Sequence, residues 1–242
     1  METACAKRSL VVLAADIGDI DDLVNMVDNV GPHIAGLKTH VDMTDGFSME
    51  EWAKVIDVAK KHDLMLFEDR KFADIGRVTE TQMAGMYDIR SWADLVTSHS
   101  VSGPDIVDGI ASAWDSVQRV GGVLLLAQMS SRGNLLDASY TDRTMEIGTS
   151  SPHVIGYIGN GSNPNEVSEL RKKAGDGKMI WTPGVNLSDN EGALGQRYGH
   201  PSDAIKAGSD AVIVGSGIHG APDPVASARA YADATWAALL SR

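Results

Sequence analysis

Short, continuous apolar runs alternate along the chain with stretches in which apolar residues return every three or four positions. Continuous runs of this kind are typical of strands that are buried on both faces, as in a parallel sheet. The expected strands are residues 10–15, 34–37, 64–67, 92–97, 123–127, 154–158, 179–182 and 211–214. The expected helices are residues 19–29, 48–61, 77–87, 105–120, 141–147, 163–173 and 202–207, with a last helix that carries Val225, Ala228, Ala232, Trp236 and Leu239 on one face.

Local signals support two of the helix starts and one long loop. Ser48 with Glu51 three residues later forms a capping box, and Asn163 followed by Pro164 is typical of a helix N-terminus. Residues 183–201 are polar, contain four glycines and lack apolar periodicity. A loop of this size in a compact domain is usually functional or disordered.

About eight repeats of strand and helix predict an α/β protein, a single (β/α)8 TIM barrel domain over residues 1–242. A doubly wound open sheet is the alternative. The chain has 242 residues, of which 43% are hydrophobic and 22% charged. This composition is ordinary for a globular protein that buries a full core.

Charge and cysteine content exclude several function classes. The net charge of −12 argues against a general nucleic-acid binder and against an anionic-membrane binder. No apolar run approaches the roughly 18 residues of a membrane span. Cys5 is the single cysteine, so no internal disulfide can form, and no metal-spaced Cys/His set exists. We therefore expect a cytoplasmic protein with neither a nucleic-acid nor a membrane partner and without a bound metal.

Charged residues gather where the expected strands end. Asp69 and Lys71 follow the third strand and, two positions apart in extended backbone, point to the same side; Asp74 comes three residues later. Asp16, Lys38 and Ser130 follow the first, second and fifth strands. In a barrel these ends meet at one mouth, where the chemistry of such folds takes place. Each residue alone could be a surface group, but together they predict a site.

A row of alternating lysines and carboxylates suits proton transfer. A lysine between carboxylates keeps its proton, so it is a better proton donor than a Schiff-base amine, which must lose it. A carboxylate placed beside a substrate anion would repel it, and the relief of that repulsion can assist a reaction. The cluster therefore suggests decarboxylation or proton transfer at carbon without a metal. The glycine-rich loop and the backbone of Gly215, Ser216 and Gly217 could hold a phosphate, although this turn by itself is weak evidence.

Several longer motifs resemble the orotidine 5′-monophosphate decarboxylase family, most closely its eukaryotic-type branch. The motifs lie in the family's order along nearly the whole chain, at residues 37–42, 67–76, 91–96, 129–131, 182–185 and 194–198. The Asp-x-Lys-x-x-Asp core alone is shared with sugar-phosphate decarboxylases and synthases of the same superfamily.

The resemblance implies a role for each matching residue. Lys71 would protonate C6 of the pyrimidine as carbon dioxide leaves, Asp69 would face the substrate carboxylate, and Lys38 would complete the charge network and touch the ribose. Asp74 would enter the site of the neighbouring subunit, which implies a homodimer. Asp16 would bind a ribose hydroxyl, Ser130 and Pro183 would lie at the pyrimidine, and Gln196 and Tyr198 would close the long loop over the phosphate. The family uses no cofactor.

The chain departs from the family pattern at two positions. Ser216 stands where the family usually has an arginine that binds phosphate, and Arg197 and His219 are candidates to replace that cation. Val78 stands where the family usually has a threonine at the ribose; Thr79 is one helical step of about 100° away and is not a simple replacement. Both departures affect binding more than proton transfer.

Two alternative functions stay open at this point. A sugar-phosphate decarboxylase or synthase would use the same charge cluster but often needs Mg²⁺. A non-catalytic nucleotide-binding barrel is suggested by the two departures. Among other conspicuous residues, Trp92 and Trp181 are expected in the core, and His40 and Asp42 are expected to orient other groups or to lie at an interface.

Overall fold

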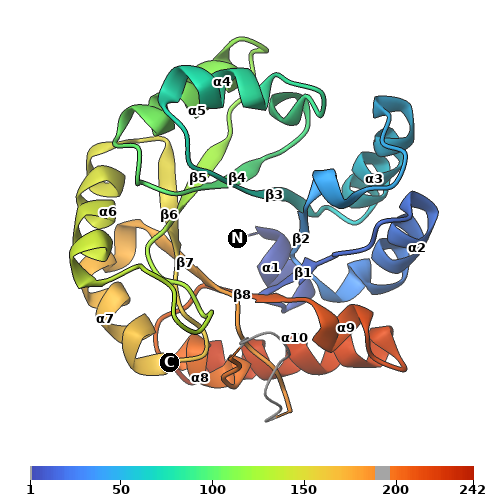
Figure 1. Cartoon of the computed structure of the whole chain (residues 1–242). Coiled ribbons are helices and arrows are strands. Elements are labelled where there is room, and N and C mark those ends of the chain that lie inside the picture. The colour runs from blue at the N-terminus through green and yellow to red at the C-terminus, as the bar shows by residue number, and fades with distance from the viewer. Residues whose placement is uncertain (1, 189–196) are drawn as a thin grey trace.

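The chain folds into a closed barrel of parallel strands surrounded by helices, shown in a computed structural model that describes residues 2–188 and 197–242 (Figure 1). The strands are β1 (Val11–Ala14), β2 (Gly36–Thr39), β3 (Met65–Phe72), β4 (Leu95–Ser98), β5 (Gly122–Leu126), β6 (Val154–Ile158), β7 (Met179–Thr182) and β8 (Ala211–Val214). They pair in chain order, and β1 pairs with β8 to close the ring. The expected barrel is confirmed and the open sheet is excluded.

Helix α1 (Glu2–Lys7) precedes β1 and lies within the ring of strands in the view of Figure 1, and the other helices surround the barrel. These are α2 (Ile20–Val30), α3 (Met49–Lys61), α4 (Gly76–Met83), α5 (Asp105–Asp115), α6 (Ala138–Ser150), α7 (Pro164–Ala174), α8 (Pro201–Lys206), α9 (Ser216–His219) and α10 (Pro224–Leu240). Short 3-10 helices are η1 (Gly31–His33), η2 (Val41–Met43), η3 (Ile89–Ser91) and η4 (Gly175–Gly177). The Ser48 side chain accepts a hydrogen bond from the Glu51 amide, as the capping box predicts.

Two predicted strands differ in their ends in a way that matters for the site. The second strand extends to Thr39, so Lys38 lies within β2 and not after it. The third strand continues through the charged residues to Phe72. Strand β2 pairs with β3 as far as Glu68, and β4 pairs with Glu68 and again with Phe72, so this pairing holds β3 on both sides of residues 69–71. Asp69 and Lys71 therefore belong to β3 itself.

The core forms two layers, one inside the barrel and one between the barrel and the helices. The interior layer contains Phe67 and Trp181, whose rings meet edge to face with centroids 5.4 Å apart. Trp92 lies in the outer layer, and both tryptophans are buried as expected. The start of α1 and the first residues of several strands line a small cavity at the amino-terminal end of the barrel. Helix α1 thus covers the amino-terminal end, and the carboxyl-terminal end is the open one.

Candidate active site

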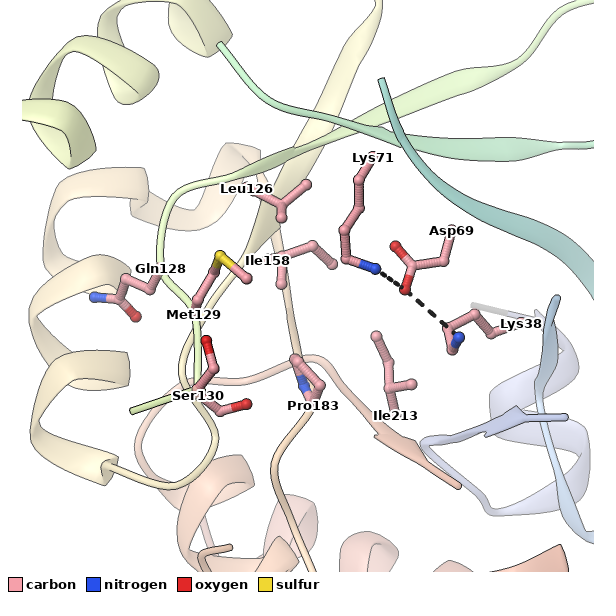
Figure 2. A pocket seen from close by; sticks show the side chains of 11 residues that line it. Lys38, Asp69, Lys71, Leu126, Gln128, Met129, Ser130, Ile158, Pro183 and Ile213 are labelled. Atoms are coloured by element: carbon pink, nitrogen blue, oxygen red, sulfur yellow. Dashed lines mark hydrogen bonds and ion pairs between the residues drawn. The ribbon is translucent and has the colours of Figure 1, made fainter. Parts of the chain in front are cut away.

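A row of charged side chains crosses the carboxyl-terminal mouth of the barrel. Lys71 Nζ lies 2.6 Å from Asp69 Oδ2, and the same oxygen lies 3.5 Å from Lys38 Nζ (Figure 2). Lys38 Nζ lies 3.3 Å from Asp16 Oδ1. Lys38 and Asp69 are nearly enclosed, with side chains 6% and 13% exposed. The structure thus joins residues at or near the carboxyl ends of three successive strands into one alternating network, as the sequence predicts.

The network keeps Asp69 ionised. Burial by itself would raise the pKa of Asp69, but Lys38 and Lys71 outweigh it and lower that pKa to about 2. A carboxylate that is charged at any physiological pH, and that cannot move away from its lysines, is a fixed negative charge in the wall of the site.

Glu68 holds the end of β2 from the outer side of the barrel. It is fully buried, and its carboxyl accepts hydrogen bonds from the Thr39 hydroxyl at 2.7 Å and from the Val41 amide at 3.1 Å. Burial raises the pKa of Glu68 to about 8, against the effect of these two hydrogen bonds. These contacts fix the backbone that follows Lys38.

A cavity of about 200 Å³ lies beside the lysines and Asp69. Its apolar wall includes Leu126, Ile158 and Ile213, which face the charged row across the cavity (Figure 2). Ser130 and Pro183 border the same space. A flat ring bound here would have cations and a carboxylate on one side and hydrocarbon on the other.

The loops after β5 and β7 approach each other closely at Ser130. Gly184 adopts a left-handed φ of 76°, and a Cβ at this position would lie 2.7 Å from the Ser130 Cβ. Only glycine allows this approach. The close packing places Gly184 against Ser130, and Pro183, the residue before Gly184, lines the same cavity as Ser130.

A second cavity of about 460 Å³ adjoins the first and shares Lys38, Asp69, Pro183 and Ile213 with it. Its remaining lining is mostly polar or backbone and includes Asp16, Tyr198, Gly215, Ser216 and His219. The structure therefore brings together the residues expected at the ribose and the phosphate, apart from Gln196, which lies outside the described residues.

The two candidates to replace the missing arginine lie in different places. Ser216 is exposed and shares its cavity with His219. Burial lowers the pKa of His219, with Asp16 opposing and Lys38 adding to the effect. Arg197 lines a neighbouring cavity, and its Nε donates a hydrogen bond to the Ser130 carbonyl at 3.1 Å. His219, not Arg197, is therefore the side chain placed beside Ser216.

Asp74 does not join the charge network of its own chain. It is exposed at the start of α4, it lines neither cavity, and its carboxylate accepts a hydrogen bond from the Ile75 amide. Val78 is 36% exposed on the same helix, whereas Thr79 is fully buried and donates its hydroxyl to the Asp74 carbonyl. Thr79 therefore does not replace a threonine at position 78, as the helical step predicts.

Two residues of the cluster received no catalytic role from their sequence positions. His40 Nε2 lies 3.5 Å from Asp69 Oδ2, and burial followed by the charge of Lys38 lowers the pKa of His40. The Thr97 hydroxyl donates to Asp69 Oδ1 at 2.7 Å. The sequence signal that could have identified Thr97 is its position: it is a polar residue directly after the apolar start of β4, Leu95 and Val96. Asp42 pairs with Arg70, so it orients a neighbouring side chain as expected.

Residues 2–188 and 197–242 contain no group of three or more His, Cys, Asp or Glu side chains that could hold a metal ion. Within the same part of the chain, every helix is too short or too polar to cross a membrane.

Comparisons with known proteins show the family to which this chain belongs. Residues 9–231 match the family described as Orotidine 5'-phosphate decarboxylase / HUMPS family. Orotidine 5'-phosphate decarboxylase of Maudiozyma exigua is 40% identical over 242 residues, which cover 98% of this chain and 88% of that protein. The enzyme of the same name from Coccidioides posadasii is 38% identical over 248 residues, which cover 100% of this chain and 90% of that protein.

Solved structures share the fold. Orotidine 5'-phosphate decarboxylase from Pyrococcus horikoshii OT3 has a TM-score of 0.74 at 25% identity and covers 93% of this chain and 98% of its own. The enzyme from Methanocaldococcus jannaschii, complexed with the inhibitor BMP, has a TM-score of 0.75 at 22% identity, covers 94% of this chain and 98% of its own, and supports the fold. The match over residues 9–231, together with relatives that are 38–40% identical over nearly the whole length, shows that this chain is a decarboxylase of the orotidine 5'-phosphate decarboxylase / HUMPS family.

Proposed function

We propose that this protein, as one barrel domain over residues 1–242, converts orotidine 5′-monophosphate into uridine 5′-monophosphate, without a metal or organic cofactor, as a step of de novo pyrimidine biosynthesis. The observation that carries the proposal is the row of Lys38, Asp69 and Lys71 opposite an apolar wall, with a second, more polar cavity next to it. The sequence relatives support the same substrate.

The geometry suggests how the reaction proceeds. The pyrimidine lies in the 200 Å³ cavity, and its carboxylate lies against the fixed negative charge of Asp69. The bond from C6 to the carboxylate breaks, carbon dioxide leaves, and the electron pair stays on C6. Lys71 Nζ donates a proton to C6 and later regains one from water. Leu126 and Ile158 favour the neutral carbon dioxide over the charged carboxylate.

The remaining residues bind the rest of the nucleotide. Asp16 and Lys38 hold ribose hydroxyls, and Ser130 with Pro183 borders the pyrimidine. The phosphate lies in the second cavity, and the backbone of Gly215 and the Ser216 hydroxyl contact it together with Gln196 and Tyr198. These assignments rest on the family resemblance and, apart from Gln196, are supported by the lining of the two cavities.

The functional unit is a homodimer in which Asp74 completes the site of the neighbouring subunit. Two observations support this arrangement: Asp74 is exposed and apart from its own network, and the apolar side chains of Ile75, Val78 and Met43 are 59%, 36% and 50% exposed. A cytoplasmic location is supported by the single, exposed cysteine, Cys5.

Turnover tests the reaction directly. The ultraviolet absorbance change on mixing purified protein with orotidine 5′-monophosphate is followed with and without EDTA, with Lys71→Ala as the control. Turnover that EDTA leaves unchanged and that Lys71→Ala abolishes supports the proposal. Turnover lost in EDTA would favour a metal-dependent sugar-phosphate enzyme, and ligand binding without turnover would favour a non-catalytic barrel.

Mixing two inactive variants tests the shared site. Lys71→Ala and Asp74→Ala each disable every site in a homodimer. A hybrid dimer has one site with both native residues, so random exchange of subunits restores about one quarter of wild-type activity. If Asp74 acts within its own chain, the mixture stays inactive and the shared site is wrong.

A further inference from the structure

Strand β3 pairs irregularly with β4 at the charge network. Glu68 pairs with Val96 and Phe72 pairs with Ser98, so β3 advances four residues while β4 advances two. The extra length forms a bulge, and Lys71 within it has a left-handed φ of 50°. A lysine adopts this conformation only where surrounding contacts hold it, and bulges beside active sites commonly redirect a side chain.

One hydroxyl group contacts both ends of this bulge. Thr97 Oγ1 accepts a hydrogen bond from the Lys71 amide at 2.9 Å and donates one to Asp69 Oδ1 at 2.7 Å. Thr97 is fully buried, and it lies on β4 between the residues that pair with Glu68 and Phe72. The hydroxyl therefore takes the place of a backbone acceptor that the irregular pairing removes.

Because of this contact, the two carboxylate oxygens of Asp69 have different partners. Oδ1 faces Thr97, and Oδ2 faces Lys71, Lys38 and His40 at 2.6, 3.5 and 3.5 Å. A carboxylate that is held through one oxygen cannot rotate freely, so its other oxygen stays directed toward the cations.

We propose that Thr97 is a positioning residue for the decarboxylation: its single hydroxyl fixes the backbone of Lys71 and the carboxylate plane of Asp69 together. This inference rests on the proposed function. Without the hydroxyl, Lys71 and Asp69 keep their charges, but the ammonium no longer has a fixed place relative to C6. Small misplacements of this kind reduce the rate of the chemical step far more than ligand affinity.

Thr97→Val and Thr97→Ser separate the hydroxyl from the shape of the side chain, because valine is nearly isosteric and serine keeps the hydroxyl. We expect Thr97→Val to lower kcat about 10- to 100-fold, with the Kd for uridine 5′-monophosphate changed less than about threefold. Thr97→Ser should keep kcat within about threefold of wild type. Thr144→Val, which removes a buried hydroxyl bonded to Ser100 Oγ away from the site, controls for general loss of stability.

Amide hydrogen exchange at Lys71, measured by NMR, provides a readout that does not depend on turnover. The Lys71 amide should exchange slowly in wild type and Thr97→Ser, and at least about tenfold faster in Thr97→Val. If the wild-type enzyme shows no turnover, the proposed function fails and this measurement alone decides whether Thr97 holds the bulge.

Any one of four results would overturn the positioning role, and the first three concern Thr97 and Lys71 directly. These are an unchanged kcat in Thr97→Val, an equal loss in Thr97→Ser, or unchanged exchange at Lys71. A kcat loss that Thr144→Val reproduces would have the same meaning, since it would reflect stability. If Thr97→Val does not fold, Thr97→Cys replaces it and should show the same losses, because a thiol is a much weaker hydrogen-bond donor and acceptor than a hydroxyl.

Discussion

Ser216→Arg tests whether this chain binds phosphate weakly because a cation is missing. Ser216 is exposed on the wall of the 460 Å³ cavity, between Gly215 and Gly217, so a longer side chain has room to extend over the cavity. Serine offers one neutral donor, whereas arginine offers two parallel charged donors that match two phosphate oxygens.

The size of the effect follows from the type of contact and from its exposure. A hydrogen bond to a charged group contributes about 1.5–3 kcal/mol, and every 1.4 kcal/mol is a factor of about ten in affinity. Water and salt screen an exposed pair, so we expect the lower end of this range. Ser216→Arg should therefore lower the KM for orotidine 5′-monophosphate and the Kd for uridine 5′-monophosphate about tenfold.

The assay compares two ligands that differ only in the phosphate. Binding of uridine 5′-monophosphate and of uridine is measured for wild type, Ser216→Arg and Ser216→Gln at low and high salt. The gain should be specific to the nucleotide, to the arginine and to low salt. Equal gains for uridine and its monophosphate, or no gain in a folded Ser216→Arg protein, would refute the reasoning that a missing cation limits binding.

Three further predictions follow from the charges and contacts of the site. The folded-state pKa of Glu68 is about 8, above its ordinary value of 4.5, so its stabilising contribution is present below pH 4.5 and is lost as pH rises toward 8. At about 1.4 kcal/mol per pKa unit, the unfolding free energy of wild type should fall by about 4–5 kcal/mol over that window, and Glu68→Gln should remove this fall. An equal pH dependence of unfolding free energy in both proteins would contradict this. The folded-state pKa of Asp69 is about 2, below its ordinary value of 3.8, so its contribution to folding stability is present above pH 3.8 and is lost as pH falls toward 2. In urea titrations at falling pH, the unfolding free energy of wild type should drop relative to that of Asp69→Asn by on the order of 2 kcal/mol. A difference that stays constant with pH would count against the charge network. His219→Gln should raise the Kd for uridine 5′-monophosphate but not for uridine; an equal change for both would place His219 away from the phosphate.

The local pattern of apolar residues was sufficient to predict most strands and helices of the barrel. Strands β6, β7 and β8 have the predicted bounds, because each is a short, largely apolar run and the apolar pattern stops where the strand ends. The predictions were less accurate where tertiary packing sets the end of a helix. Helix α4 ends at Met83 and not at residue 87, and α5 ends at Asp115 and not at residue 120. Trp92 precedes β4, where its indole donates to the Tyr87 carbonyl.

In the site, too, some features could be predicted from local sequence and others depend on tertiary packing. Its charged residues could be predicted because a barrel brings the carboxyl ends of all its strands to one mouth. Asp16, Lys38, Asp69 and Lys71 therefore need only lie at or near those ends. The sequence by itself determined these residue types and their order, since hydrophobic periodicity and strand-end position are local properties. The tertiary structure alone decided that β3 bulges against β4, that Thr97 contacts both Lys71 and Asp69, and that His219 rather than Arg197 lies beside Ser216. These features depend on strand register and loop packing between residues far apart in the chain, which no local pattern specifies.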